Sequence, residues 1–134
     1  MEPTVTRTIL LDVAPGPGEA FERSFLTRNG YEVVACHGPL QGELCPLLRG
    51  DGCSMFEGAH GVVFELDLDR PQHRAIVERY RALAGPDLPI RVVTSPAQAQ
   101  RYAAFLGSVR AWPHLPDAAD LDGFAAEIEA LDRM

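Results

Sequence analysis

Three aspartates and a threonine stand where apolar runs of the chain end. Asp12 closes the first run, Asp67 and Asp69 follow the third, and Thr94 closes the fourth. Two carboxylates on one rim supply the oxygen ligands that Mg2+ prefers, and a neighbouring hydroxyl can hydrogen-bond a phosphoryl oxygen. These residue types indicate a site for Mg2+ and a phosphoryl group, provided that the fold brings the ends of the runs together. Aspartates in such places also cap helices and turns, so a purely structural role stays open.

A second group of reactive side chains lies in an irregular segment at residues 36–60, which is rich in glycine and proline. It contains every cysteine of the chain, namely Cys36, Cys45 and Cys53, together with His37 and His60. Thiolate and imidazole are ligands of Zn2+ and other thiophilic metals, and thiols also respond to oxidants. The gaps of eight and seven residues between the cysteines exceed those between paired zinc ligands. Packing thiols, redox-responsive thiols and metal ligands therefore stay open as three interpretations.

An alternation of short apolar strands and amphipathic helices must position these side chains. The pattern predicts strands over residues 8–13, 31–36, 61–66, 88–94 and 109–112, and helices over residues 19–28, 71–84, 97–106 and 117–131. Such alternation indicates a parallel sheet that is covered by helices on both faces. Five units in 134 residues predict a single α/β domain over residues 1–134. We expect a flavodoxin-like three-layer sandwich whose five-stranded parallel sheet has the order 2-1-3-4-5.

The composition excludes several classes of function. The chain has 12 basic and 19 acidic residues and a net charge of -7, which argues against binding to nucleic acid or to an anionic membrane. All of the basic residues are arginine, so mechanisms that need a lysine are excluded. No apolar run reaches the roughly 18 residues of a membrane span, and the first residues lack a secretory pattern. We therefore expect a soluble cytoplasmic protein whose cysteines are thiols or metal ligands.

The acidic motifs, taken in order, resemble those of a response-regulator receiver domain over nearly the whole chain. Asp12, with Pro15 three residues later, resembles the acidic motif of the first strand, and residues 67–71 resemble the family's Asp-x-x-x-Pro segment. The resemblance implies that Asp67 is the phosphoacceptor. It also implies a Mg2+ site formed by the side chains of Asp12 and Asp67 and the backbone carbonyl of Asp69.

The later part of the chain carries the same resemblance. Thr94 resembles the switch hydroxyl of the fourth strand, and Trp112 holds the place of the aromatic switch residue of the fifth strand. Residues 115–116, Leu-Pro, occupy the place of the family's Lys-Pro. The resemblance therefore implies a bacterial two-component signalling protein that is controlled by phosphorylation.

Three departures from the family pattern indicate a degenerate receiver. Val13 stands where the family has a second acidic residue, and the lysine that neutralises the phosphoryl charge is missing. Arg110 or His114 could replace that lysine only with a different geometry. The glycine usual soon after Pro71 is also absent. Because catalysis of phosphoryl transfer depends on positioning and charge stabilisation, such a pocket should react slowly.

We therefore expect a stand-alone, non-enzymatic pseudo-receiver that signals through protein–protein interaction, with or without phosphorylation of Asp67. Its partners would be a sensor kinase or a downstream effector, met through the surface of the fourth and fifth helical units and the strand between them. A homodimer is compatible with this expectation. The alternative is a redox or metal sensor that uses Cys36, Cys45 and Cys53 on a receiver-like scaffold, with Mg2+ favoured over Zn2+ as a cofactor. A scaffold that uses the fold only for association is the third hypothesis.

Overall fold

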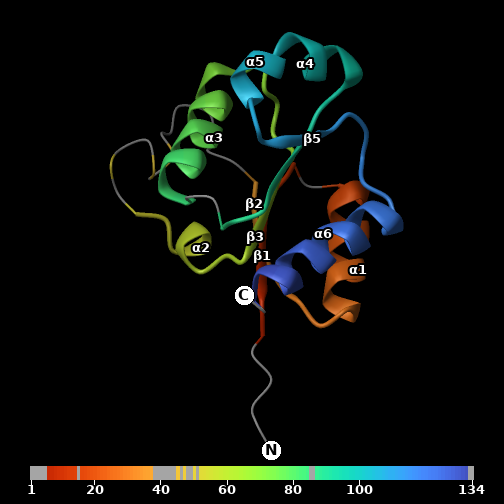
Figure 1. Cartoon of the computed structure of the whole chain (residues 1–134). Coiled ribbons are helices and arrows are strands. Elements are labelled where there is room, and N and C mark those ends of the chain that lie inside the picture. The colour runs from red at the N-terminus through yellow and green to blue at the C-terminus, as the bar shows by residue number, and fades with distance from the viewer. Residues whose placement is uncertain are drawn as a thin grey trace, which may run out of the picture.

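The computed structural model describes residues 6–14, 16–37, 45, 47, 50, 52–84 and 87–132 of the chain. Within these residues, five parallel strands form one sheet in the order β2-β1-β3-β4-β5. The strands are β1 (Thr8–Asp12), β2 (Glu32–Cys36), β3 (Gly61–Phe64), β4 (Ile90–Val93) and β5 (Arg110–Trp112). The predicted parallel sheet and its strand order are confirmed. Figure 1 shows the sheet between two layers of helices.

The two helical layers are unequal in their composition. Helices α1 (Pro17–Arg28) and α6 (Ala118–Asp132) cover one face, where they contact each other (Figure 1). The other face carries α2 (Ser54–Glu57), α3 (Pro71–Ala84), α4 (Pro96–Arg101) and α5 (Ala103–Leu106). The helix predicted over residues 97–106 is thus two short helices, which meet at Tyr102. None of the helices in the described ranges is long and apolar enough to cross a membrane.

Alternation along β1 builds a separate hydrophobic core on each face of the sheet. Ile9 and Leu11 point toward α1 and α6, where they pack with Phe124 and other residues of those helices. Leu10 points the other way, into a larger cluster that includes Tyr80 of α3. Asp12 lies two residues after Leu10 on the same strand, so its side chain points to the same face of the sheet, toward α3. This alternation decides which side chains can meet at the strand ends.

The loop between β3 and α3 is held by local hydrogen bonds. The backbone N–H of Asp69 donates to Asp67 Oδ1 at 2.9 Å, and the backbone N–H of Arg70 donates to the Asp67 carbonyl oxygen at 3.0 Å. Gln98 Nε2 reaches across from α4 and donates to the same Asp67 Oδ1 at 2.9 Å. Gln98 also closes a capping box with Ser95 at the start of α4. The loop and the first turn of α4 are therefore one connected unit.

Candidate functional site

Asp12 is buried inside the core rather than displayed at the rim. Its carboxyl is 1% exposed, and Tyr80 Oη donates to Asp12 Oδ2 at 2.7 Å. Burial raises the pKa of Asp12 to about 7, although hydrogen bonds from Tyr80 and Cys36 oppose that shift. Cys36 lies beside Asp12 because the two residues are register partners at the ends of β2 and β1. The partners of Asp12 therefore come from β2 and α3.

Asp67 and Asp69 lie in the exposed loop after β3, and their contacts are different. Asp67 Oδ1 accepts the hydrogen bonds from Asp69 and Gln98 described above. Asp69 Oδ1 accepts from Tyr102 Oη and from Arg101 Nη1, each at 2.8 Å. The hydrogen bond from Tyr102 is the main cause that lowers the pKa of Asp69. Both aspartates thus connect the β3–α3 loop to α4.

The two carboxyls predicted to hold Mg2+ have different hydrogen-bond partners. Asp12 faces Tyr80 in the core, whereas Asp67 faces α4 from the loop, and the two carboxyls share no hydrogen-bond partner. In the described part of the chain, no group of three or more histidine, cysteine, aspartate or glutamate side chains could hold a metal ion. A Mg2+ site of two carboxyls and the Asp69 carbonyl is smaller than such a group, and it stays a prediction of the sequence resemblance.

The carboxyl that stands at the end of β3 belongs to Glu65. The strand ends at Phe64, two residues earlier than the sequence predicted, so Glu65 is the first residue beyond it. Its backbone N–H donates to the carbonyl oxygen of Asp12 at 2.6 Å, which fixes Glu65 at the end of β1. Glu65 lies two residues after Val63, so its side chain points to the same face of the sheet, toward α1. There it meets Glu22.

Glu22 and Glu65 form a buried pair of carboxyl groups. Glu22 is 1% exposed, and among the described residues neither of its carboxyl oxygens has a hydrogen-bond partner of normal geometry. Glu65 Oε2 is also buried and also has no hydrogen-bond partner among the described residues. Burial, and then the neighbouring Glu65, raise the pKa of Glu22 to about 9, and burial also raises the pKa of Glu65. Two such carboxyls cannot both ionise at neutral pH, so the pair retains one proton.

Thr94 joins this end of the sheet as the sequence predicted. It directly follows β4, is 6% exposed, and its Oγ1 has no hydrogen-bond partner among the described residues. A pocket of about 510 Å³ brings Thr94 together with Glu65, Asp67 and Gln98, with Arg70 and His73 also in its wall. Burial lowers the pKa of His73, so its imidazole is neutral at neutral pH. Of the predicted site residues, Asp67 and Thr94 meet here, and Asp12 does not.

Sequence reasoning missed Glu22 and Glu65, although each had a signal. Glu65 directly follows the apolar run of residues 61–64, which is the first place where a rim carboxyl can stand. Glu22 lies four residues before Leu26, on the stripe of α1 that faces the core. A charged residue on such a stripe is unusual, because burying a carboxyl without a partner is costly. A carboxyl on the core-facing side of α1 could therefore have indicated a site at Glu22.

The three cysteines gather around the core on the α3 side. All are thiols of intermediate exposure, and all pack against the cluster that contains Leu10, Phe56 and Tyr80. The two neighbouring histidines are engaged elsewhere. His37 Nε2 is 3.0 Å from Glu19 Oε1, and His60 Nδ1 accepts from the backbone N–H of Thr8 at 3.0 Å. The structure therefore does not gather these histidines with the thiols as a metal site.

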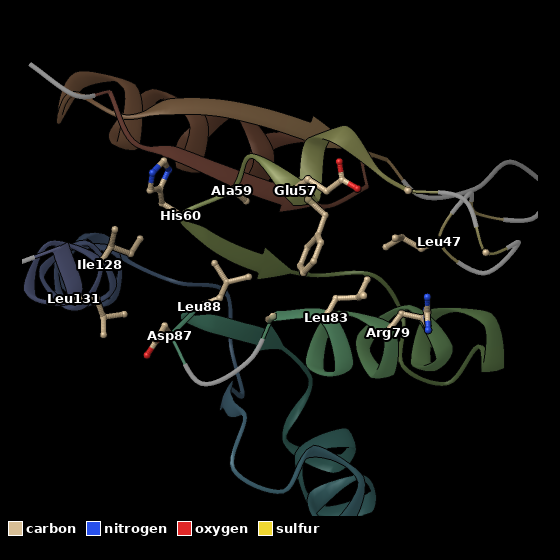
Figure 2. A pocket seen from close by; sticks show the side chains of 14 residues that line it. Leu47, Glu57, Ala59, His60, Arg79, Leu83, Asp87, Leu88, Ile128 and Leu131 are labelled. Carbon is tan, nitrogen blue, oxygen red and sulfur yellow. The ribbon is translucent and has the colours of Figure 1, made fainter. Parts of the chain in front are cut away.

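A larger pocket lies at the opposite end of the sheet. Figure 2 shows this cavity of about 630 Å³, with Leu83 and Leu88 on one side and Ile128 and Leu131 of α6 beside them. His60 and Leu88 in its wall lie just before β3 and β4. Ligands of open parallel sheets bind beyond the carboxyl ends of the strands, so the pocket around Thr94 and Glu65 is the better candidate.

The comparisons with known proteins agree with this architecture. No protein-family model matches the chain, and no curated protein matches it. Among solved structures, the chain is similar to the solution structure of a response regulator protein from Burkholderia multivorans, with a TM-score of 0.64 and 22% sequence identity. The match covers 93% of this chain and 96% of that chain. At this identity the likeness shows the fold, and we conclude that the chain is a receiver-like domain with the fold of a response regulator.

Proposed function

We propose that the chain is a receiver-like signalling domain that works through protein contacts and does not need phosphoryl transfer at its strand-end pocket. The observation that carries this proposal is the Glu22–Glu65 pair. A carboxyl must be ionised to attack a phosphoryl group. Glu65 shares a proton with Glu22 and is buried against it, so it is a poor nucleophile.

Phosphorylation of Asp67 has less support than the sequence resemblance implied. Asp67 is exposed, but its carboxyl is engaged by Asp69 and Gln98, and among the described residues it belongs to no group of three or more histidine, cysteine, aspartate or glutamate side chains that could hold a metal ion. A phosphoryl transfer depends on a metal ion and on charges that are fixed around the transferred group. We therefore assign Asp67 a structural role in joining the β3–α3 loop to α4.

The edge strand β5 offers the surface that best fits a partner. It ends the sheet, and two grooves of about 380 and 750 Å³ run along it. Arg91 and Arg110 line both grooves, and Arg81 lines the larger one. Arg91 is buried and already paired with Glu127, but Arg81 and Arg110 are exposed. Acidic residues also line the grooves, namely Glu78 and Glu127 in the larger one and Asp120 in the smaller one, so arginine exceeds them by one side chain in each. In a chain of net charge -7, this excess of arginine favours an acidic, extended segment of a partner protein.

The test of the proposal is intact-mass measurement after incubation with acetyl phosphate and Mg2+. We expect no phosphoryl adduct on the wild-type protein, under conditions in which a separate receiver domain with a complete acidic pocket is phosphorylated. The variants Asp67→Asn and Glu65→Gln identify the acceptor if an adduct forms. An adduct that is lost in Asp67→Asn would overturn the proposal and restore Asp67 as the phosphoacceptor.

A second candidate function is a response of the thiols to oxidants. It is favoured by the contact between Cys36 and the buried carboxyl of Asp12, and by the packing of all three thiols on one core cluster. A nearby carboxylate can accept a proton from a thiol, and the thiolate is the form that oxidants attack. Under this candidate the receiver-like fold is the scaffold and the thiol side of the core is the sensor.

A further inference from the structure

Strand β2 is an edge of the sheet that remains partly exposed. It stands at one end of the strand order and pairs with β1 alone. The inner strand β3 is buried along its whole length, whereas residues 33–36 of β2 are each only partly buried. An edge strand of this kind presents unpaired backbone groups to which another strand can hydrogen-bond.

The hydrogen bonds between β2 and β1 show which backbone groups of β2 are already used. The backbone N–H of Glu32 donates to the Arg7 carbonyl oxygen at 2.9 Å, at the start of the strand. At its end, the Cys36 carbonyl oxygen accepts from the backbone N–H of Val13 at 3.0 Å. Because the direction of these groups alternates along a strand, Val34 also directs its N–H and C=O toward β1.

The remaining two residues of β2 direct their backbone groups away from the sheet. These are Val33 and Ala35, and no described residue hydrogen-bonds their outward N–H and C=O groups. The opposite edge of the sheet offers less. There the backbone N–H of Thr94 donates to the Trp112 carbonyl oxygen at 2.9 Å, so the three-residue strand β5 directs only Ala111 outward. The edge at β2 is therefore the longer free edge among the described strands.

The side chains of β2 do not protect this edge against pairing. Natural edge strands are often protected by lysine, proline or inward-pointing charges, and residues 32–36, Glu-Val-Val-Ala-Cys, include a single charge at the first position. Val34 packs beside the core cluster on the α3 face, and Val33 packs beside the cluster on the α1 face. An added strand would therefore extend an apolar surface on both faces of the sheet.

We propose that two copies of this chain pair through β2, antiparallel about a two-fold axis at Val34, and so join their sheets into one. In this register Val34 faces Val34 of the second copy, and Val33 faces Ala35. The outward groups of each Val33–Ala35 pair exchange two hydrogen bonds. Glu32 faces the uncharged Cys36, so no like charges oppose each other, and this self-complementarity favours a second copy as the occupant. The interface uses neither the strand-end pocket nor the grooves along β5, so it goes beyond the proposed function.

A cysteine placed at the proposed axis tests the pairing directly. Residues that face each other there, in a pair without hydrogen bonds, have Cα atoms about 4.5 Å apart, which is within the range that a disulfide spans. We expect mild oxidation of Val34→Cys to link residue 34 of two copies, as mapped by peptide mass spectrometry. Val33→Cys is the matched control, because Val33 is also partly exposed but faces Ala35 of the second copy. Residue 33 should therefore not link to itself.

Sedimentation equilibrium of charged variants tests the axis in a second way. Val34→Lys and Val34→Glu should each weaken the dimer at least about tenfold, because like charges then face each other. An equal mixture of the two variants should associate again, because opposite charges face each other in the mixed pair. Added salt should not weaken the wild-type dimer, since each copy carries a net charge of -7 and the contacts are apolar or between backbone groups.

Three results would overturn the proposal. The first is a wild-type protein that stays monomeric at concentrations up to about 1 mM, including one whose β2 edge binds only a different protein. The second is a dimer in which both cysteine variants link equally or neither links. The third is a dimer that salt weakens, which would point to the arginine-lined grooves along β5. Because Val34 is partly buried, thermal unfolding identifies a charged variant that does not fold, and the wild-type and cysteine measurements then decide the question.

Discussion

The buried carboxyl groups are the residues that distinguish this chain. Glu22, Glu65 and Asp12 all lie near the ends of β1 and β3, and burial raises the pKa of each of them. Here the carboxyls are held partly protonated, which makes the pocket sensitive to protons.

Glu22→Gln should make the stability of the protein less dependent on pH. The pKa of Glu22 is about 9 in the folded state and near 4.5 in the unfolded chain. The folded state therefore holds its proton more tightly, and stability declines as the pH rises from about 4.5 to about 9. The amide needs no proton, so we expect the variant to gain about 4 kcal/mol on the wild type at pH 8 relative to pH 5, at about 1.4 kcal/mol for each of the three pH units.

Urea unfolding at the two pH values measures this effect. Glu32→Gln is the matched control, because Glu32 is exposed at the start of β2 and should leave the pH dependence unchanged. An unchanged pH dependence in Glu22→Gln would show that the pair does not share a proton.

Tyr80→Phe should destabilise the protein through the same group of buried polar residues. The substitution removes the hydrogen bond that Asp12 Oδ2 accepts, and a buried acceptor without a partner costs about 1–3 kcal/mol. Because that bond lowers the pKa of Asp12, its loss should also raise this pKa further. Tyr102→Phe removes a hydrogen bond to the exposed Asp69 and should cost less in the same urea titration. Equal losses in the two variants would contradict the buried role of Tyr80.

The elements of secondary structure were largely predictable from hydrophobic periodicity. The sequence predicted all five strands, and the strand order 2-1-3-4-5 agrees with the structure. The errors are the helix predicted over residues 97–106, which is two short helices, the unpredicted helix α2, and the ends of elements, where apolar patterning and hydrogen bonding diverge. Leu66 is buried like a strand residue, although β3 stops at Phe64. That difference of two residues placed the rim carboxyl at Asp67 instead of Glu65.

The candidate site was less predictable from the sequence. It depends on which face of the sheet each side chain points to, and on contacts between residues that are far apart in the sequence. Asp12 ends an apolar run as expected, but its parity sends the side chain into the α3 side of the core. Glu22 meets Glu65 only after α1 has packed against the sheet. No spacing rule within the sequence encodes either outcome. Thr94 was placed correctly because it follows a strand whose end the apolar pattern locates within one residue.

The groove between β5 and α6 should bind an acidic peptide through Arg110. We expect a fluorescently labelled oligoglutamate peptide to bind the wild-type protein weakly, with an affinity that falls as salt rises. Arg110→Glu should abolish the binding because it reverses an exposed charge in both grooves. Arg23→Glu, on exposed α1, keeps the net charge equal and should bind as the wild type does. Equal loss in both variants would indicate a response to net charge and would contradict a groove site.

The whole molecule combines a receiver-like scaffold with two chemically different regions. At the strand ends, Glu22 and Glu65 share a proton beside the pocket of Thr94. On the α3 side of the same sheet, Cys36 lies beside Asp12, which accepts the hydrogen bond of Tyr80. The ends of β1 and β3 connect the two regions through backbone hydrogen bonds.

The central claim, that a proton-sharing carboxyl pair lies beside the strand-end pocket, is tested most directly by an NMR titration of the glutamate side-chain carboxyl carbons. The account predicts one carboxyl with a pKa of about 9 in the wild-type protein, absent from Glu22→Gln. In that variant, the pKa of Glu65 should stay above its ordinary value, because burial is what raises it. A wild-type spectrum in which every glutamate titrates near its ordinary pKa would contradict the claim.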